Sequence, residues 1–158
     1  FFFFLIFFFT YNTQSHTHIH STSKILSRLN GLEIFTVDES TYTSFGHTLS
    51  SKVRAPAVRN DKIDSSAAVQ RCLTYKKVWA SFSQKRENSK TLCAVWEPVA
   101  PKGFVALGLV FTSGETIQKP KQKVLCMRKD LTRRVKVDSK IVWHDKVRGS
   151  FSLSFSII

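Results

Sequence analysis

Two groups of residues in this sequence contain histidines that could bind a metal or act as an acid or a base. His16, His18 and His20 alternate, so on an extended chain their imidazoles would project from one side and could hold a soft transition metal. No fourth ligand lies close by in the sequence, and the surrounding Ser, Thr and Asn are typical of a solvated segment. We therefore expect no metal site here.

The second arrangement is His144 beside Asp145. Adjacent residues of a strand point to opposite faces, so this pair would not work together as an acid and a base. The chain also contains no nucleophile elbow, phosphate-binding loop or paired metal-ligand motif. We expect no catalytic residues and no cofactor, and we expect that the protein is not an enzyme.

The cysteines also show no pattern that predicts disulfide bonds or metal binding. Cys72, Cys93 and Cys126 are odd in number and contain no Cys-x-x-Cys spacing, which argues against a disulfide framework or a zinc site. Reduced thiols in a cytoplasmic protein are the simpler explanation. Cys93 and Cys126 lie inside apolar runs, so we expect them to be small core residues.

Charge is the stronger signal. The net charge is +13, and it is concentrated in the second half: residues 71–158 hold eighteen Lys or Arg against six Asp or Glu, whereas residues 1–70 hold six against five. A basic surface implies an anionic partner, which could be nucleic acid, acidic lipid or an acidic protein, unless these residues form an ordinary solvated face. The candidate contacts lie in two short stretches. Lys119, Lys121 and Lys123 alternate in the first, and Arg134 and Lys136 alternate in the second beside the neighbouring Arg133.

Basic residues lie on either side of a largely apolar segment that should form the centre of the fold. This segment is VWEPVAPKGFVALGLVF, residues 95–111. Pro98 and Pro101 exclude helix interior and predict an extended segment or turn. Gly103 predicts a turn, because glycine accepts a positive φ without strain. Residues 104–111 are apolar on both faces and predict one buried strand, within which Gly108 indicates a bulge or a close backbone approach.

Short strand patterns separated by polar loops occupy the rest of the second half. They predict an all-β fold, an antiparallel sandwich or prism-like module, with no amphipathic helix after residue 66. The last pattern reaches the end of the chain, so we expect a module that is incomplete at its C-terminus. The predicted strands are residues 69–75, 76–82, 92–96, 123–128, 133–137, 141–143 and 151–157.

The N-terminal third carries weaker signals. We expect residues 1–66 to be a largely disordered, low-complexity linker and residues 67–158 to be the β module. Within the linker, Asn30-Gly31 divides an apolar stretch and allows a hairpin over residues 25–37. The opening FFFFLIFFF is too short to cross a bilayer, and it is interpreted either as a gene-model artefact or as a membrane-dipping anchor.

A series of motifs in the second half resembles a known family. It begins with an aromatic residue followed by Val-Trp (Tyr75 to Trp79), and continues with Trp-x-Pro-x-x-Pro-x-Gly-Phe-Val-x-Leu-Gly from Trp96 to Gly108. Leu-Cys-Met-Arg-x-Asp-Leu, Val-Trp-x-Asp and Phe-Ser follow in order. Residues 68–156 thereby resemble the β-rich repeat module of plant vacuolar protein sorting-associated protein 13-like proteins and the vacuolar protein sorting-associated protein 62 domain.

That resemblance implies a non-catalytic module of a vacuolar protein sorting or lipid-transfer-type protein, recruited to membranes through an adaptor protein or anionic lipid. It transfers no individual binding residue. It also implies a cytoplasmic protein that contacts membranes peripherally. The alternative is a basic nucleic-acid-binding module, in which bases would stack on aromatic residues lying among the cations. Those residues are Tyr75, Trp79, Phe82 and Trp143.

Overall fold

The computed structural model describes residues 2–5, 24–29, 32–48, 56–81, 92–133, 141–144 and 153–156. The regular secondary structure of these residues is almost entirely strand, which confirms the predicted all-β class. Apart from the strands there is one four-residue helix and one three-residue 3-10 turn. In chain order the elements are β1 (Phe2–Leu5), β2 (Lys24–Leu29), β3 (Leu32–Thr36), β4 (Tyr42–Ser44), β5 (Ala57–Arg59), α1 (Asn60–Ile63), β6 (Val69–Arg71), β7 (Thr74–Ala80), β8 (Leu92–Val99), β9 (Phe104–Ala106), β10 (Val110–Gly114), β11 (Leu125–Arg128), η1 (Lys129–Leu131), β12 (Ile141–His144) and β13 (Leu153–Ser156).

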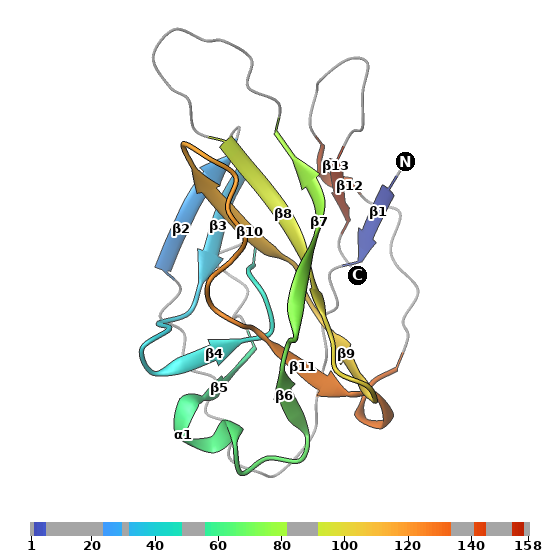
Figure 1. Cartoon of the computed structure of the whole chain (residues 1–158). Coiled ribbons are helices and arrows are strands. Elements are labelled where there is room, and N and C mark those ends of the chain that lie inside the picture. Colours follow the sequence, from blue (N-terminus) through green and yellow to red (C-terminus); the bar gives the residue numbers. More distant parts are fainter. Residues whose placement is uncertain are drawn as a thin grey trace, which may run out of the picture.

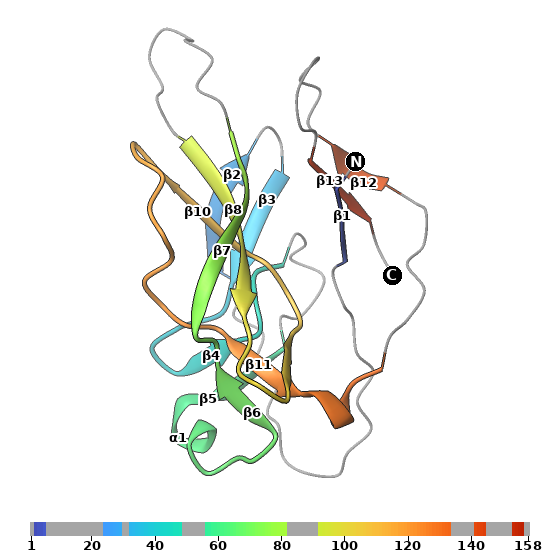
Figure 2. The ribbon, with the colours of Figure 1, turned by 45° about the vertical axis from the view of Figure 1, so that its right-hand side comes forward.

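The strands form small sheets with the orders β10-β8-β7, β6-β11-β9, β1-β13-β12, β2-β3 and β4-β5. The pairing is antiparallel throughout, except that β1 runs parallel to β13. Sheets β2-β3, β10-β8-β7 and β1-β13-β12 share one half of the molecule, and β4-β5, β6-β11-β9 and α1 the other (Figure 1). Figure 2 shows that β1-β13-β12 stands beside β10-β8-β7 and does not extend it.

The expected single strand over residues 104–111 is divided in the structure. Its first part, β9, pairs with β11, whereas its last part, β10, pairs with β8 in a different sheet. The break falls at Leu107–Leu109, where Gly108 approaches the backbone of Phe45 and Gly46 too closely to leave room for a side chain. The close approach expected at Gly108 is therefore confirmed, and it explains why the apolar run changes sheets.

The extended segment and turn expected around Pro98, Pro101 and Gly103 are present in the structure. Pro98 lies inside β8, opposite Tyr75 of β7, but β10 pairs with β8 only as far as Trp96. Proline lacks a backbone N–H, and it is tolerated there because β8 has a partner on one side alone. At the corner, the Phe104 N–H donates to the Pro101 carbonyl at 3.0 Å. Gly103 has a φ of 84° between them, as a type II turn requires.

The segment expected to be a linker differs most from the sequence interpretation. Residues 24–63 contribute β2 to β5 and α1, with β2 and β3 paired so that Leu29 lies opposite Leu32, the register of the hairpin allowed at residues 30–31. One buried cluster joins this segment to the rest of the chain across residue 66. Its members are Phe45, Ile63, Val69, Leu107 and Leu125. Short polar strands were missed because three-residue elements give no periodicity to detect.

The three thiols lie in the core, as expected for two of them. Cys72, Cys93 and Cys126 are free and buried, with exposed fractions of 1%, 4% and 0%. Burial raises the pKa of Cys126 to about 12 and also raises that of Cys93, which disfavours the reactive thiolate. These cysteines therefore serve packing.

The strands β1, β12 and β13, at the two ends of the described chain, pair with one another. The Phe-rich segment contributes β1, which lies against β13. The strand expected over residues 133–137 and the alternating histidines at positions 16, 18 and 20 fall outside the described residues, apart from Arg133. None of the helices found in the described part of the chain has the length and apolar character needed to span a bilayer.

Candidate functional site

The lysine-bearing segment between β10 and β11 is fixed to the module by hydrogen bonds. The Tyr75 hydroxyl donates to the Gln122 carbonyl at 2.5 Å and accepts from the Val124 N–H at 3.0 Å. The Cys72 N–H donates to the Val124 carbonyl at 2.9 Å. Lys119 Nζ donates to Thr74 Oγ1 at 2.9 Å. A loop of polar residues is thus attached to β7 and to the end of β6 at four points.

The six basic residues predicted to contact an anionic surface do not all lie together in the structure. Lys119, Lys121 and Lys123 are all exposed and lie on this one anchored segment. Arg133 is exposed too, but it lies beyond η1, at the far end of β11 from Lys123. Arg134 and Lys136 lie outside the described residues. Of the six predicted contacts, the ones that the structure places together on one segment are therefore Lys119, Lys121 and Lys123.

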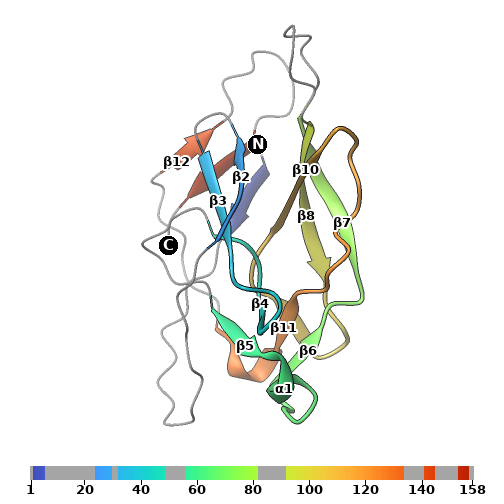
Figure 3. The same cartoon turned by 90° about the vertical axis from the view of Figure 1, so that its left-hand side faces the viewer.

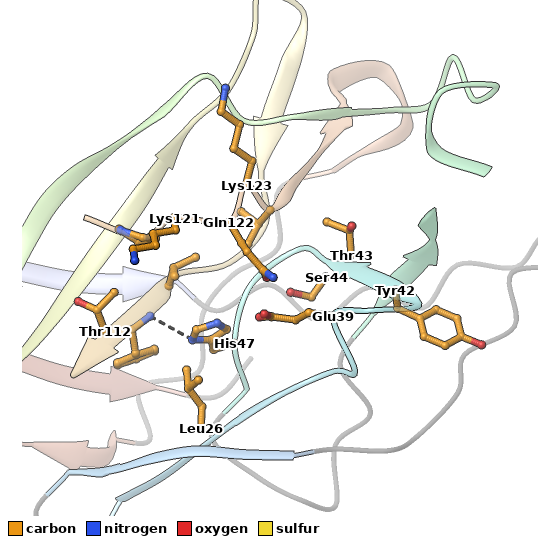
Figure 4. Close-up of a pocket in the computed structure, with 14 residues that line it drawn as sticks. Leu26, Glu39, Tyr42, Thr43, Ser44, His47, Thr112, Lys121, Gln122 and Lys123 are labelled. Carbon is orange, nitrogen blue, oxygen red and sulfur yellow. Dashed lines mark hydrogen bonds between the residues drawn. The ribbon is translucent and has the colours of Figure 1, made fainter. Parts of the chain in front are cut away.

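A pocket of about 240 Å³ opens beside this segment. Residues 120–124 form one wall, the segment before and within β4 forms the facing wall, and the start of β10 forms the floor (Figure 4). Apolar side chains of Leu26, Val110 and Phe111 line part of it. The polar residues that line the pocket are Glu39, Tyr42, Thr43, Ser44, His47, Thr112, Lys121, Gln122 and Lys123.

His47 is the titratable group held most firmly in this pocket. Its Nδ1 accepts a hydrogen bond from the Phe111 N–H at 3.1 Å, and its ring lies nearly parallel to the Phe111 ring at 20°. Burial lowers the pKa of His47 from 6.5 to about 4, so the imidazole is neutral near pH 7. With Nδ1 acting as an acceptor, the proton of the neutral ring resides on Nε2. His47 therefore offers one N–H donor to the pocket.

The facing wall is also ordered by hydrogen bonds. Thr36 Oγ1 donates to Glu39 Oε1 at 3.2 Å, and Asn60 Nδ2 donates to the Glu39 carbonyl at 3.3 Å. Thr43 Oγ1 donates to Asn60 Oδ1 at 2.7 Å, which ties the start of α1 to β4. The Glu39 carboxylate lies next to His47 and Ser44 at the pocket (Figure 4). This arrangement holds a carboxylate, a neutral imidazole and a lysine around one small space.

Sequence reasoning did not select His47 or Glu39. A lone histidine in a polar stretch carries no spacing signal, and the pairing of residue 47 with residues 109–111 is visible only in the fold. Reasoning from sequence also gave Tyr75 the wrong environment. Base stacking requires an exposed ring, but the Tyr75 ring is buried, with 6% of the residue exposed. Among the described residues there is no cluster of His, Cys, Asp and Glu able to hold a metal.

Comparison with protein families decides the relationship suggested by the motifs. The sequence matches the family described as Vacuolar protein sorting-associated protein 62 over residues 12–157. The chain belongs to this family. The match begins well before residue 68, where the motif resemblance began, so the part of the chain that matches the family includes β2 to β5. Membership implies a role related to vacuolar protein sorting.

Solved structures support the fold. The crystal structure of GNIP1Aa from Chromobacterium piscinae is similar with a TM-score of 0.59 and 19% sequence identity. The similarity covers 78% of this chain but only 25% of GNIP1Aa, so this chain spans about a quarter of that protein. At this identity the likeness concerns the fold alone. No curated protein matches the sequence.

Proposed function

We propose that this chain is a non-catalytic module that acts in vacuolar protein sorting by contacting acidic membrane surfaces. The observation that carries the proposal is the presentation of Lys119, Lys121 and Lys123 on one anchored segment. Membership of the vacuolar protein sorting-associated protein 62 family supplies the membrane-trafficking context.

The physical argument rests on the position and the fixed backbone of these lysines. A basic residue near an anionic leaflet contributes about 1 kcal/mol, so three acting together give roughly 3 kcal/mol, or on the order of a 100-fold change in binding. Because the Tyr75 and Cys72 bonds hold the backbone of the segment in place, little backbone entropy is lost on contact. Membrane binding of this size is weak alone and suited to recruitment.

Nucleic-acid binding is the competing function, and the structure gives it less support. The ring of Tyr75 is buried and its hydroxyl is bonded at both the donor and acceptor positions, so it offers no face to a base. Trp79 remains partly exposed on β7. An electrophoretic mobility shift with single-stranded RNA tests the competing function, which requires a shift that weakens steeply as salt is raised.

Vesicle co-sedimentation tests the proposal. The full 158-residue chain is mixed with vesicles that contain phosphatidylserine or only neutral lipid, together with the triple variant K119Q/K121Q/K123Q. Glutamine at position 119 keeps a donor for Thr74 Oγ1. The matched control is K62Q/K102Q/K129Q, which removes three exposed lysines outside the segment.

We expect binding to the anionic vesicles, a loss on the order of 100-fold in the triple variant, and little change in the control. Equal losses in both variants would show that only net charge matters. Failure of the natural sequence to bind anionic vesicles would overturn the membrane proposal, and RNA binding in the same buffer would replace it with the alternative.

A further inference from the structure

We propose that the pocket between residues 39–47 and residues 120–124 binds a small zwitterionic group, a phosphate joined to an ammonium as in phosphocholine or phosphoethanolamine. This inference shares Lys121 with the membrane contact above, but it also requires His47 and Glu39, which take no part in that contact, and so it does not depend on it. Its basis is the placing of Lys121 and of Glu39 around the neutral His47, at the same small pocket (Figure 4).

The size of the pocket restricts the ligand. Pockets for drug-sized molecules have volumes of about 300–1,000 Å³. At about 240 Å³ this pocket lies below that range, so it suits a headgroup-sized molecule better than an acyl chain or a peptide. Its floor of Val110 and Phe111 at the start of β10 is apolar, which favours a ligand with a methylene or methyl portion.

The phosphate end is matched by donors. His47 uses Nδ1 to accept from Phe111, which leaves Nε2–H, and no described residue accepts a hydrogen bond from it. Lys121 lines the same pocket and carries a full positive charge, which suits a phosphate oxygen. In Figure 4 the Gln122 side chain extends toward Ser44 and Glu39, whereas Lys123 extends away from His47. Lys121 and His47 are therefore the residues assigned to the anion.

The ammonium end is matched by Glu39. Its carboxylate is oriented by the Thr36 hydroxyl at 3.2 Å and lies beside His47 at the pocket. A negative charge here repels a ligand that is purely anionic, and Lys121 repels one that is purely cationic. A ligand carrying both charges meets an opposite charge at each end. Electrostatic complementarity of this kind confers specificity more than affinity.

Isothermal titration calorimetry of the full chain tests this inference. The probes are phosphocholine, inorganic phosphate and choline, each at the same ionic strength. The variants are Glu39→Gln, which keeps the acceptor for Thr36, and Lys121→Gln, with Lys102→Gln as a control on an exposed lysine outside the pocket. Thermal unfolding of each variant verifies that it is folded.

We expect saturable binding of phosphocholine, with weaker binding of phosphate and of choline. Glu39→Gln should weaken phosphocholine about fivefold while leaving phosphate unchanged or tighter, and Lys121→Gln should weaken phosphocholine and phosphate about fivefold each, because both charges are partly solvated. Lys102→Gln should bind as the natural sequence does. Absence of saturable phosphocholine binding, or equal affinity of Glu39→Gln for it, would overturn the inference.

A further experiment with vesicles distinguishes a lipid headgroup from a soluble ligand as the natural occupant of the pocket. Neutral phosphatidylcholine vesicles that compete with free phosphocholine would identify a lipid headgroup as the ligand, and a free phosphocholine signal that such vesicles do not displace would identify a soluble ligand. Because Glu39 takes no part in the contact with anionic vesicles, Glu39→Gln should lose phosphocholine affinity while keeping phosphatidylserine binding. Either activity can therefore fail while the other remains.

Discussion

Gly46 and Gly108 meet backbone to backbone. A Cβ placed on Gly108 would lie 2.9 Å from the Phe45 carbonyl oxygen, and one placed on Gly46 would lie 3.0 Å from the Gly108 Cα. The adjacent His47 N–H donates to the Leu109 carbonyl at 2.9 Å. This contact attaches the segment after β4 to the break between β9 and β10, and so it positions His47 at the pocket. Figure 3 shows β4 at the same end of the molecule as β5, α1, β6 and β11.

Replacing Gly108 by Ala should destabilise the fold by about 2 kcal/mol, because overpacking against backbone atoms costs roughly 1–3 kcal/mol. Urea unfolding at pH 7 measures the loss. Gly114→Ala is the matched control: its nearest non-neighbouring atom would be the Thr116 carbonyl oxygen at 3.5 Å, an ordinary contact. That variant should change stability by no more than about 0.5 kcal/mol. Equal effects of the two substitutions would contradict the proposed role of the contact.

Gly103→Ala should act through backbone conformation alone. The φ of 84° is strained for an L side chain, yet a Cβ at this position would meet nothing within 4 Å. We expect a loss of about 1 kcal/mol in the free energy of unfolding. Gly103→Asn should lose less, since asparagine tolerates this conformation better than alanine. The order Gly, Asn, Ala in urea midpoints checks the prediction, and an alanine variant as stable as the natural chain would refute it.

Tyr75→Phe should loosen the lysine-bearing segment. The substitution keeps the buried ring but removes the hydroxyl that donates to the Gln122 carbonyl and accepts from the Val124 N–H. Leaving a buried donor unsatisfied costs about 1–3 kcal/mol. Hydrogen exchange of the Val124 amide should accelerate accordingly, while the Cys93 amide, bonded to Ser81 Oγ at 2.8 Å, reports global stability. Unchanged protection of Val124 relative to Cys93 would argue against the anchor.

Sequence reasoning succeeded where local chemistry determines the structure. Pro98 and Pro101 exclude a helix, Gly103 adopts a positive φ, and Gly108 allows another part of the backbone to approach closely. Each of these features follows from one residue and its neighbours in sequence. It failed where a distant segment decides the outcome. Nothing in residues 104–111 reveals that Gly46 interrupts the strand, and nothing near His47 reveals that the Phe111 N–H will hold its ring.

Prediction of the candidate site failed for the same reason, because the site depends on segments that are distant in sequence. Lys119, Lys121 and Lys123 are exposed, but the pocket beside them is made from segments about eighty residues apart in sequence. Its facing wall lies in the stretch that composition assigned to a linker. Polar Ser, Thr and Asp residues there support short strands through side-chain hydrogen bonds such as Thr43 to Asn60, which composition alone cannot distinguish from disorder.

The stability of the fold should fall on acidification through His47. Burial lowers its pKa from 6.5 to about 4 in the folded state, whereas the unfolded chain keeps the ordinary value. Above pH 6.5 the imidazole is neutral in both states, and stability is highest. As pH falls toward about 4 the unfolded state binds a proton that the folded state does not, so stability decreases, by at most roughly 3 kcal/mol, and then levels off.

Urea unfolding between pH 4 and pH 7 measures this decrease, with His47→Asn as the comparison. Asparagine Oδ1 can accept from the Phe111 N–H as Nδ1 does, so the hydrogen bond is kept while the titration is removed. Because the two proteins differ at this position alone, the difference between their profiles isolates the contribution of residue 47. We expect the natural chain to lose more stability than the variant across this range. Parallel profiles would show that His47 keeps an ordinary pKa and that burial does not hold it neutral.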